Sequence, residues 1–181
     1  MASFYSGSSA SPDVILVVMG VNDINNDNDF YRFVTDKVDL GRFVYTSSHD
    51  GNEIASLDLT GSPYSFTAGI QATLITLKKS FPNANIKIGF TPSGMQYIVN
   101  GFRYPTDGFD PAEVLEKYLK RIEFCAHQYG VQYIDTLSCG ISWWLTEDWN
   151  QYIKSPNDNH PSADGMVRIA DYMSRLLLNN L

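Results

Sequence analysis

The sequence is poor in cysteine, in basic residues and in long apolar runs, and each shortage excludes a class of protein. Its two cysteines, Cys125 and Cys139, form no CxxC pair, so neither a disulfide framework nor a zinc site is expected. Lys and Arg total 13 against 20 Asp and Glu, and the net charge of −7 disfavours nucleic acid and anionic membranes as partners. No apolar run approaches the roughly 20 residues of a membrane-spanning helix. No membrane span is therefore expected.

The composition is that of one globular domain over residues 1–181. The 181 residues are 44% hydrophobic and 18% charged, which is enough apolar material for a single core. Residues 1–11 have the composition of a linker or a tag, and they lack the charged and apolar blocks of a signal peptide.

Strand and helix patterns alternate along the chain. Continuous or alternating apolar residues predict strands over 13–19, 86–91 and 131–135. Apolar residues at helical spacing predict helices over 66–80, 111–129 and about 163–178. This β-α-β-α-β-α order predicts an α/β fold with a parallel sheet and helices on both of its faces. In such sheets ligands bind beyond the carboxyl ends of the strands.

The predicted helices carry their own start and stop residues. Pro82 is expected to end the first, Gly130 ends the second, and Ser162 precedes the third. The second begins with Asp110, Pro111 and Glu113, which resemble a capping box. In the third helix, the spacing is expected to turn five side chains inward: Met166, Ile169, Ala170, Met173 and Leu177.

Three long segments interrupt the alternation and are expected to be loops at one end of the sheet. Residues 25–64 are an insertion with a predicted hairpin around Asp50-Gly51. Residues 92–109 form the second, and residues 136–161, which contain three tryptophans, form the third. Long loops in a compact domain are often functional, although surface decoration is the alternative for each of them.

Three polar residues in these segments could carry chemistry. His160, in "SPNDNHPSADG", lies two residues after Asp158, and side chains two apart on an extended segment share a face. Asp158 could thus hold one ring nitrogen while the other acts as a general base. Asn22, in "MGVNDIN", follows the first strand and could donate its amide to an oxyanion. Taken singly, a loop histidine is more often structural, and Asn-Asp after a strand more often forms a turn or cap.

Taken together, these motifs resemble those of the SGNH hydrolases, the GDSL-type lipases and esterases. "VILVVMGVNDINN" is similar to the block with the family's catalytic asparagine, which falls on Asn22, and "NDNHPSADGMVRIADYM" to the block with its histidine, which falls on His160. "FTAGIQATLITLKKSFPNANIKIGFTP" and "YLKRIEFCAHQYGVQYIDT" are similar to the connecting units. The resemblance covers most of residues 12–180 outside 25–64. It implies a three-layer α/β/α, flavodoxin-like fold and hydrolysis of acyl or acetyl esters by a serine, with no metal and no cofactor.

The sequence departs from the family pattern at two places. The family's aspartate usually lies three residues before the histidine, where this chain has Asn157, and Asp158 is one step closer. The family's Gly-Asp-Ser block is absent, so the chain is expected to begin partway through the family fold. Ser6, Ser8, Ser9 and Ser93 lack the strand-to-helix turn that would expose a nucleophile, so the attacking serine is not identified.

Two functions therefore stay open. The first is an ester hydrolase acting on a small acyl or acetyl ester, such as an acylated carbohydrate, through His160, Asp158 and Asn22. The second is a module on the same scaffold that binds carbohydrate or protein without catalysis, as the missing nucleophile and the aromatic loops suggest. In both cases strand 13–19 is expected to be buried on both faces and to have one unpaired edge. A second copy of the chain or the N-terminal segment would cover that edge, because exposed apolar edges aggregate.

Overall fold

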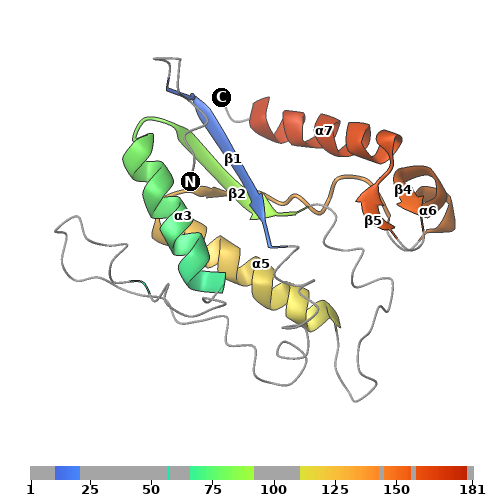
Figure 1. The fold of residues 1–181 in the computed structure, drawn as a ribbon, viewed down its shortest axis with the longest axis horizontal. Helices are drawn as coiled ribbons and strands as arrows, with labels where there is room; N and C mark the ends of the chain where they lie inside the picture. The colour runs from blue at the N-terminus through green and yellow to red at the C-terminus, as the bar shows by residue number, and fades with distance from the viewer. Residues whose placement is uncertain are drawn as a thin grey trace.

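The computed structural model describes residues 11–20, 57, 66–91, 111–142, 145–155 and 158–178. Within them, strands and helices follow one another along the chain (Figure 1). The strands are β1 (Val14–Met19), β2 (Asn85–Phe90), β3 (Gln132–Tyr133), β4 (Ile153–Ser155) and β5 (Asp158–Pro161). The helices are α3 (Phe66–Ser80), α5 (Pro111–Gln128), α6 (Thr146–Tyr152) and α7 (Ala163–Leu178).

Strands β1, β2 and β3 form a parallel sheet with β2 in the middle. Val14 pairs with Asn85 at one end of β1, and Met19 pairs with Phe90 at the other. Parallel neighbours need a long crossover, which contains α3 between β1 and β2 and α5 between β2 and β3. The predicted α/β class and parallel sheet are confirmed, and each of the three strands begins within one residue of its predicted start, although β3 is shorter than predicted. As expected, β1 is at an edge of the sheet and pairs only with β2 among the described residues.

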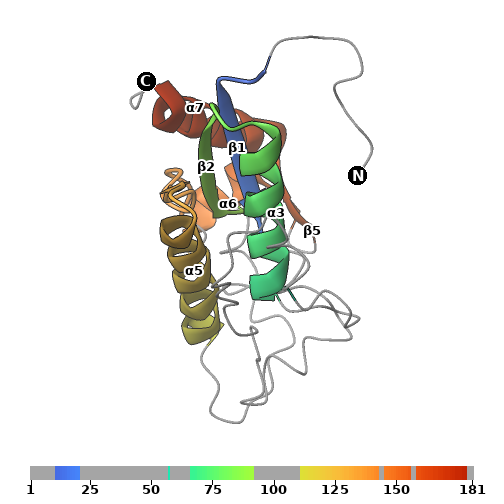
Figure 2. The same cartoon turned by 90° about the vertical axis from the view of Figure 1, so that its left-hand side faces the viewer.

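The main core lies between the sheet and the helices α3 and α5. Because strand side chains alternate between faces, Ile86, Ile88 and Phe90 point to the same side of β2, and all three are buried. They pack against a buried group from both helices and the turn after α5: Phe66, Ile70, Leu74, Leu115, Tyr118, Ile122, Cys125, Ala126 and Val131. Figure 2 shows α3 and α5 extending together away from the sheet strands.

The helix α7 contacts β2 from the other side. Lys87 lies between Ile86 and Ile88, so its side chain points to the face opposite α3 and α5. The residue is fully buried, and its Nζ donates a hydrogen bond of 3.2 Å to the carbonyl of Leu176 in the last turn of α7.

The predicted helix ends agree with the structure. Helices α3 and α7 have the expected bounds, and α5 ends at Gln128, one residue earlier than predicted. Gly130 has a φ of 61°, a left-handed conformation that favours glycine, and it closes α5 as expected. Ser162 caps α7, because its Oγ accepts a hydrogen bond of 3.1 Å from the Gly165 N–H.

The predicted inward face of α7 is partly wrong. Met173 is buried, and Ile169 and Leu177 are half-buried, but Met166 is 58% exposed and Ala170 is also exposed. The physical reason is the close contact at Gly165, where an added Cβ would lie 2.2 Å from the Tyr152 carbonyl oxygen. Gly165 therefore faces inward, and Met166, the next residue of the helix, points about 100° around the helix axis from it. A glycine contributes nothing to a hydrophobic pattern, so the sequence did not reveal this contact.

Two further expectations are corrected. Val18 in β1 is 42% exposed and no β1 side chain is fully buried, because β1 has only one strand neighbour within the described sheet. Residues 136–161 are not one loop, since they contain α6 and the antiparallel pair β4–β5. Both elements are too short for a periodic pattern. The expected hairpin at 50–51 and the 92–109 loop lie outside the described residues.

Candidate functional site

Two of the three predicted catalytic residues lie on the short strand β5. Asp158 opens the strand opposite Ser155 of β4, and His160 follows two positions later. The extended backbone assumed from the sequence is confirmed, although the pairing of β4 with β5 is irregular between Ile153 and Ser155, so a shared face for the two side chains stays a prediction. His160 is exposed. The side chain of Asp158 lies outside the described part of the structure, so its contact with His160 stays a prediction.

The junction between β5 and α7 is held by Ser162. Its backbone N–H donates to the Tyr152 carbonyl at 2.7 Å, and its Oγ donates to the Gln151 carbonyl at 2.7 Å. The same Oγ accepts from the Gly165 N–H and caps α7. Ser162 therefore connects α6, β5 and α7 two residues after His160.

The contacts of α7 place β5 relative to the sheet. Leu176 meets Lys87 within β2, while Tyr172, one turn earlier, donates from its hydroxyl to the carbonyl of Asp135 at 2.7 Å. Asp135 follows the carboxyl end of β3. The N-terminal part of α7 therefore lies nearer the carboxyl ends of the strands than its C-terminal part does. His160 precedes that N-terminus, and Figure 1 shows β5 at this end of the sheet. Ligand sites of parallel α/β sheets are built at this end.

The carboxyl end of β1 is shaped by Gly20. Its φ is 107°, and an added Cβ would lie 2.5 Å from the Phe90 ring, so only glycine fits here without strain. Asn22, the third predicted catalytic residue, follows two positions later and lies outside the described residues. Its distance from His160 is accordingly untested.

Sequence reasoning missed Asp135, which organises the segment after β3. One carboxylate oxygen accepts from the N–H groups of Leu137 at 2.9 Å and Ser138 at 3.3 Å, and the other accepts from the Ser138 hydroxyl. Thr136 donates its hydroxyl to the Phe90 carbonyl and ties the segment to β2. An aspartate directly after the strand pattern "VQYID" was the available signal, because Asp commonly bonds to backbone groups two residues on.

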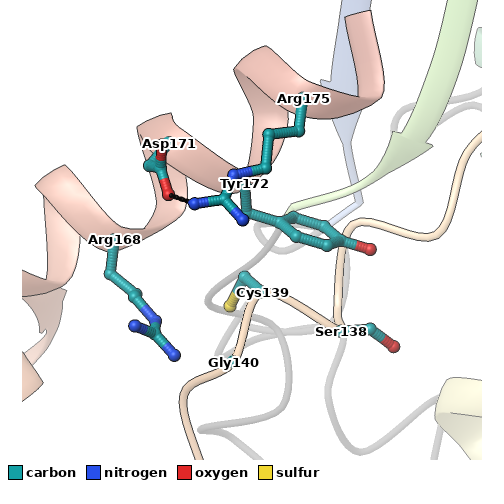
Figure 3. A pocket seen from close by; sticks show the side chains of 7 residues that line it. All are labelled: Ser138, Cys139, Gly140, Arg168, Asp171, Tyr172 and Arg175. Atoms are coloured by element: carbon teal, nitrogen blue, oxygen red, sulfur yellow. Dashed lines mark hydrogen bonds and ion pairs between the residues drawn. The ribbon is translucent and has the colours of Figure 1, made fainter. Parts of the chain in front are cut away.

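A groove of about 160 Å³ lies between this segment and α7 (Figure 3). It is lined by Ser138, Cys139, Gly140, Arg168, Asp171, Tyr172 and Arg175. Asp171 and Arg175 form an ion pair of 2.6 Å. Burial raises the pKa of the Tyr172 hydroxyl, and the nearby Asp135 carboxylate raises it further. His160, the one predicted site residue whose side chain is described, does not line the groove. The four α7 residues recur at helical spacing, which from the sequence resembles an ordinary solvated face.

The cysteines do not supply a nucleophile in the described part of the chain. Both are free and buried. Burial raises the pKa of Cys125 to about 12, although Arg121 opposes the shift, and burial also raises the pKa of Cys139. A thiol with a raised pKa stays protonated near neutral pH and is a poor nucleophile.

Across the described ranges, no group of three or more His, Cys, Asp or Glu side chains is arranged to hold a metal ion. None of the helices in the same ranges is both long and apolar enough to cross a bilayer.

Comparison with known proteins supports the fold alone. No family model and no curated protein sequence matches the chain. A protein known from a crystal structure aligns with a TM-score of 0.56 and 20% sequence identity, over 90% of this chain and 62% of that chain. This chain thus spans about three fifths of the length of the solved protein. At this identity the likeness shows a shared α/β arrangement and carries no conclusion about activity.

Proposed function

We propose that the chain is an SGNH-type ester hydrolase domain acting on a small acyl or acetyl ester, such as an acylated carbohydrate. The observation that carries the proposal is that Asp158 and His160 both lie on the short strand β5, next to the carboxyl ends of the sheet strands, with His160 exposed. In the proposed complete fold, the helices form the outer layers of a three-layer, flavodoxin-like α/β/α sandwich.

In the proposed mechanism, His160 takes the proton from an attacking serine hydroxyl. Asp158 accepts a hydrogen bond from the other ring nitrogen and stabilises the imidazolium that forms. Asn22 donates its side-chain amide to the oxyanion of the tetrahedral intermediate, an interaction worth about 2.7–4 kcal/mol in such sites. The imidazolium then protonates the leaving alkoxide, and water attacks the acyl-enzyme by the same route in reverse.

The attacking serine is the unassigned part of this mechanism. The sequence contains no Gly-Asp-Ser. Ser162 is closest to His160 in sequence, but its hydroxyl both donates to Gln151 and caps α7, so it is not poised to attack. Ser138 is likewise engaged, since its hydroxyl donates to Asp135.

The proposed dyad can be tested without a nucleophile. We expect the NMR signals of the His160 ring to change in Asp158→Asn, because the variant removes the carboxylate that is proposed to accept the ring N–H. Asp164→Asn, an exposed carboxylate in the first turn of α7, is the matched control. A His160 ring signal that changes equally in both variants, or in neither, would reject the dyad.

The missing nucleophile gives a second test. This chain alone should hydrolyse an activated acetyl ester hardly faster than buffer, and a serine-reactive phosphonate should fail to label it. Stoichiometric labelling of one serine, abolished by His160→Ala and retained in His127→Ala, would show that a serine within these residues attacks. His127 is a suitable control because it is an exposed histidine at the end of α5.

A non-catalytic binding module on the same scaffold is the second candidate, and the absence of Gly-Asp-Ser favours it. The two can be separated by titrating the protein with one oligosaccharide in acetylated and deacetylated forms while following both by NMR. Equal binding of the two forms without release of acetate would favour the module. Binding that requires the acetyl group and is lost in His160→Ala and Asn22→Ala would favour the esterase site.

A further inference from the structure

We propose that the groove between residues 138–140 and α7 binds a small oxyanion, namely a carboxylate or phosphate group. The site is distinct from the proposed general base, since His160 is not among the described residues that line the groove. The proposal depends on the arrangement of charge and backbone around Arg168.

The guanidinium of Arg168 lies directly against the backbone of Gly140. Gly140 has a φ of 78°, and an added Cβ would lie 2.8 Å from Nη2 and 3.1 Å from Nε of Arg168. Figure 3 shows this side chain extending from α7 toward the segment with Gly140 and Cys139. The absence of a side chain at residue 140 therefore leaves space for the planar guanidinium, which presents several N–H donors in a fixed fork.

Arg168 contributes a positive charge that no carboxylate neutralises among the residues with described placement. Asp171 is three residues away on the same helix, but it pairs with Arg175 at 2.6 Å. The carboxylate of Asp135 is occupied by two backbone N–H groups and the Ser138 hydroxyl. The described lining thus carries two arginines against one aspartate, a net charge of +1 in a chain of net charge −7, while the Asp135 carboxylate lies near Cys139 and Tyr172 outside the lining. Arginine forks match the geometry of carboxylate and phosphate oxygens.

The other walls limit the size and character of the ligand. The hollow is about 160 Å³, which suits a single small anionic group. The Tyr172 hydroxyl is engaged with the Asp135 carbonyl, so the tyrosine offers its ring as a wall. Cys139 is buried beside it. Recognition should therefore come from Arg168, because Arg175 is paired with Asp171.

The experiment measures binding of sodium phosphate and of sodium acetate to the full chain by NMR titration at low ionic strength. We expect saturable binding of at least one anion with perturbed signals from residues 138–140 and α7. Arg168→Ala should weaken it about tenfold or more, which is the usual effect of losing a charge-assisted hydrogen-bonded pair. Arg168→Lys keeps the charge without the planar fork of N–H donors, so its affinity for the anion should fall between those of the unmodified chain and Arg168→Ala. Binding of phosphate alone, of acetate alone or of both would identify the oxyanion accepted.

Asp171→Asn should have the opposite effect. Because it frees Arg175 from its ion pair, a second guanidinium becomes available to the groove, and anion binding should tighten several-fold. The control is Lys120→Gln on α5, which removes an exposed cation that is paired with Glu116 at 3.5 Å and should change nothing. Circular dichroism of each variant checks the fold. No saturable binding to the unmodified chain, equal affinity in Arg168→Ala, or weaker binding in Asp171→Asn would overturn the proposal.

Discussion

Replacement of Ser162 by alanine is expected to loosen the junction that positions His160. The substitution removes two hydrogen bonds made by one hydroxyl, the cap to the Gly165 N–H and the bond to the Gln151 carbonyl. Loss of an N-cap side chain typically costs about 1 kcal/mol, within a range of about 0.5–2. A net contribution of about 0.5–1.5 kcal/mol is usual for a further hydrogen bond. The expected loss of stability is therefore about 1–2.5 kcal/mol, toward the lower end because the Gln151 bond is exposed.

Two other substitutions at this position separate the two bonds. Ser162→Thr keeps a hydroxyl and should cost less than about 0.5 kcal/mol, since threonine is also a good cap. Ser162→Asp keeps the acceptor for the Gly165 N–H but has no proton for Gln151, so its stability should fall between those of the alanine variant and the unmodified chain.

The assay is urea unfolding at neutral pH with linear extrapolation to water. The control is Ser174→Ala on the exposed face of α7, where the hydroxyl only bonds to the Ala170 carbonyl one turn earlier. Alanine favours the helix interior, so this control should be neutral or slightly stabilising. The reasoning is refuted if Ser162→Ala is as stable as Ser174→Ala, or if Ser162→Asp is no more stable than Ser162→Ala.

Three further predictions concern single residues. Gly165→Ala should destabilise the chain by about 1–3 kcal/mol in urea unfolding despite the helix propensity of alanine, because the Cβ would lie 2.2 Å from the Tyr152 carbonyl; a stabilised variant would contradict this contact. Gly130→Ala should lower stability by about 1–2 kcal/mol through its φ of 61° alone, and Gly130→Asn by less, as thermal melts would reveal. Burial raises the pKa of the Cys125 thiol to about 12 in the folded chain, against 9.0 when the chain is unfolded. Above pH 9 the unfolded chain therefore loses this proton while the folded chain keeps it. The free energy of unfolding should fall from pH 9 toward 12 by up to about 1.4 kcal/mol per pH unit. Cys125→Ala should show a shallower fall over the same range, and an unchanged slope would count against the shift.

Elements with local signals were predictable from the sequence, and elements fixed by distant contacts were not. Helices α3 and α7 have the predicted bounds because apolar spacing, Pro82 and Ser162 act within one or two turns. Strand β3 was expected over 131–135 and spans only Gln132–Tyr133, although the Ile134 N–H still donates to the Ile88 carbonyl at 2.9 Å. Helix α6 escaped prediction because seven residues are too few for a helical pattern.

The same distinction applies to the candidate site: residues with a local sequence signal were predicted, and residues brought together by packing were not. His160 and Asp158 were identified from their own short motif, and their position on one strand follows from local extension. The groove was not predicted, because Gly140 and Arg168 are far apart in sequence and meet only when α7 packs against the segment after β3. Met166 was assigned to the core because hydropathy does not register the close backbone contact at Gly165.

The location of His160 in the fold therefore depends on how α7 is held, and two long-range hydrogen bonds contribute to this. Lys87 and Leu176 are 89 residues apart in sequence, and Asp135 and Tyr172 are 37 apart, so these bonds form only when the sheet and helix are assembled. Leu176 and Tyr172 are one turn apart, about 6 Å along the axis, and Ser162 precedes Tyr172 by roughly 15 Å. A helix is stiff over this length, so docking at Lys87 and Asp135 also sets where Ser162 and the end of β5 lie. The proposed chemistry depends on the motif around His160, while the buried Lys87 and the Asp135 carbonyl, both far from it in sequence, determine where that motif lies in the fold.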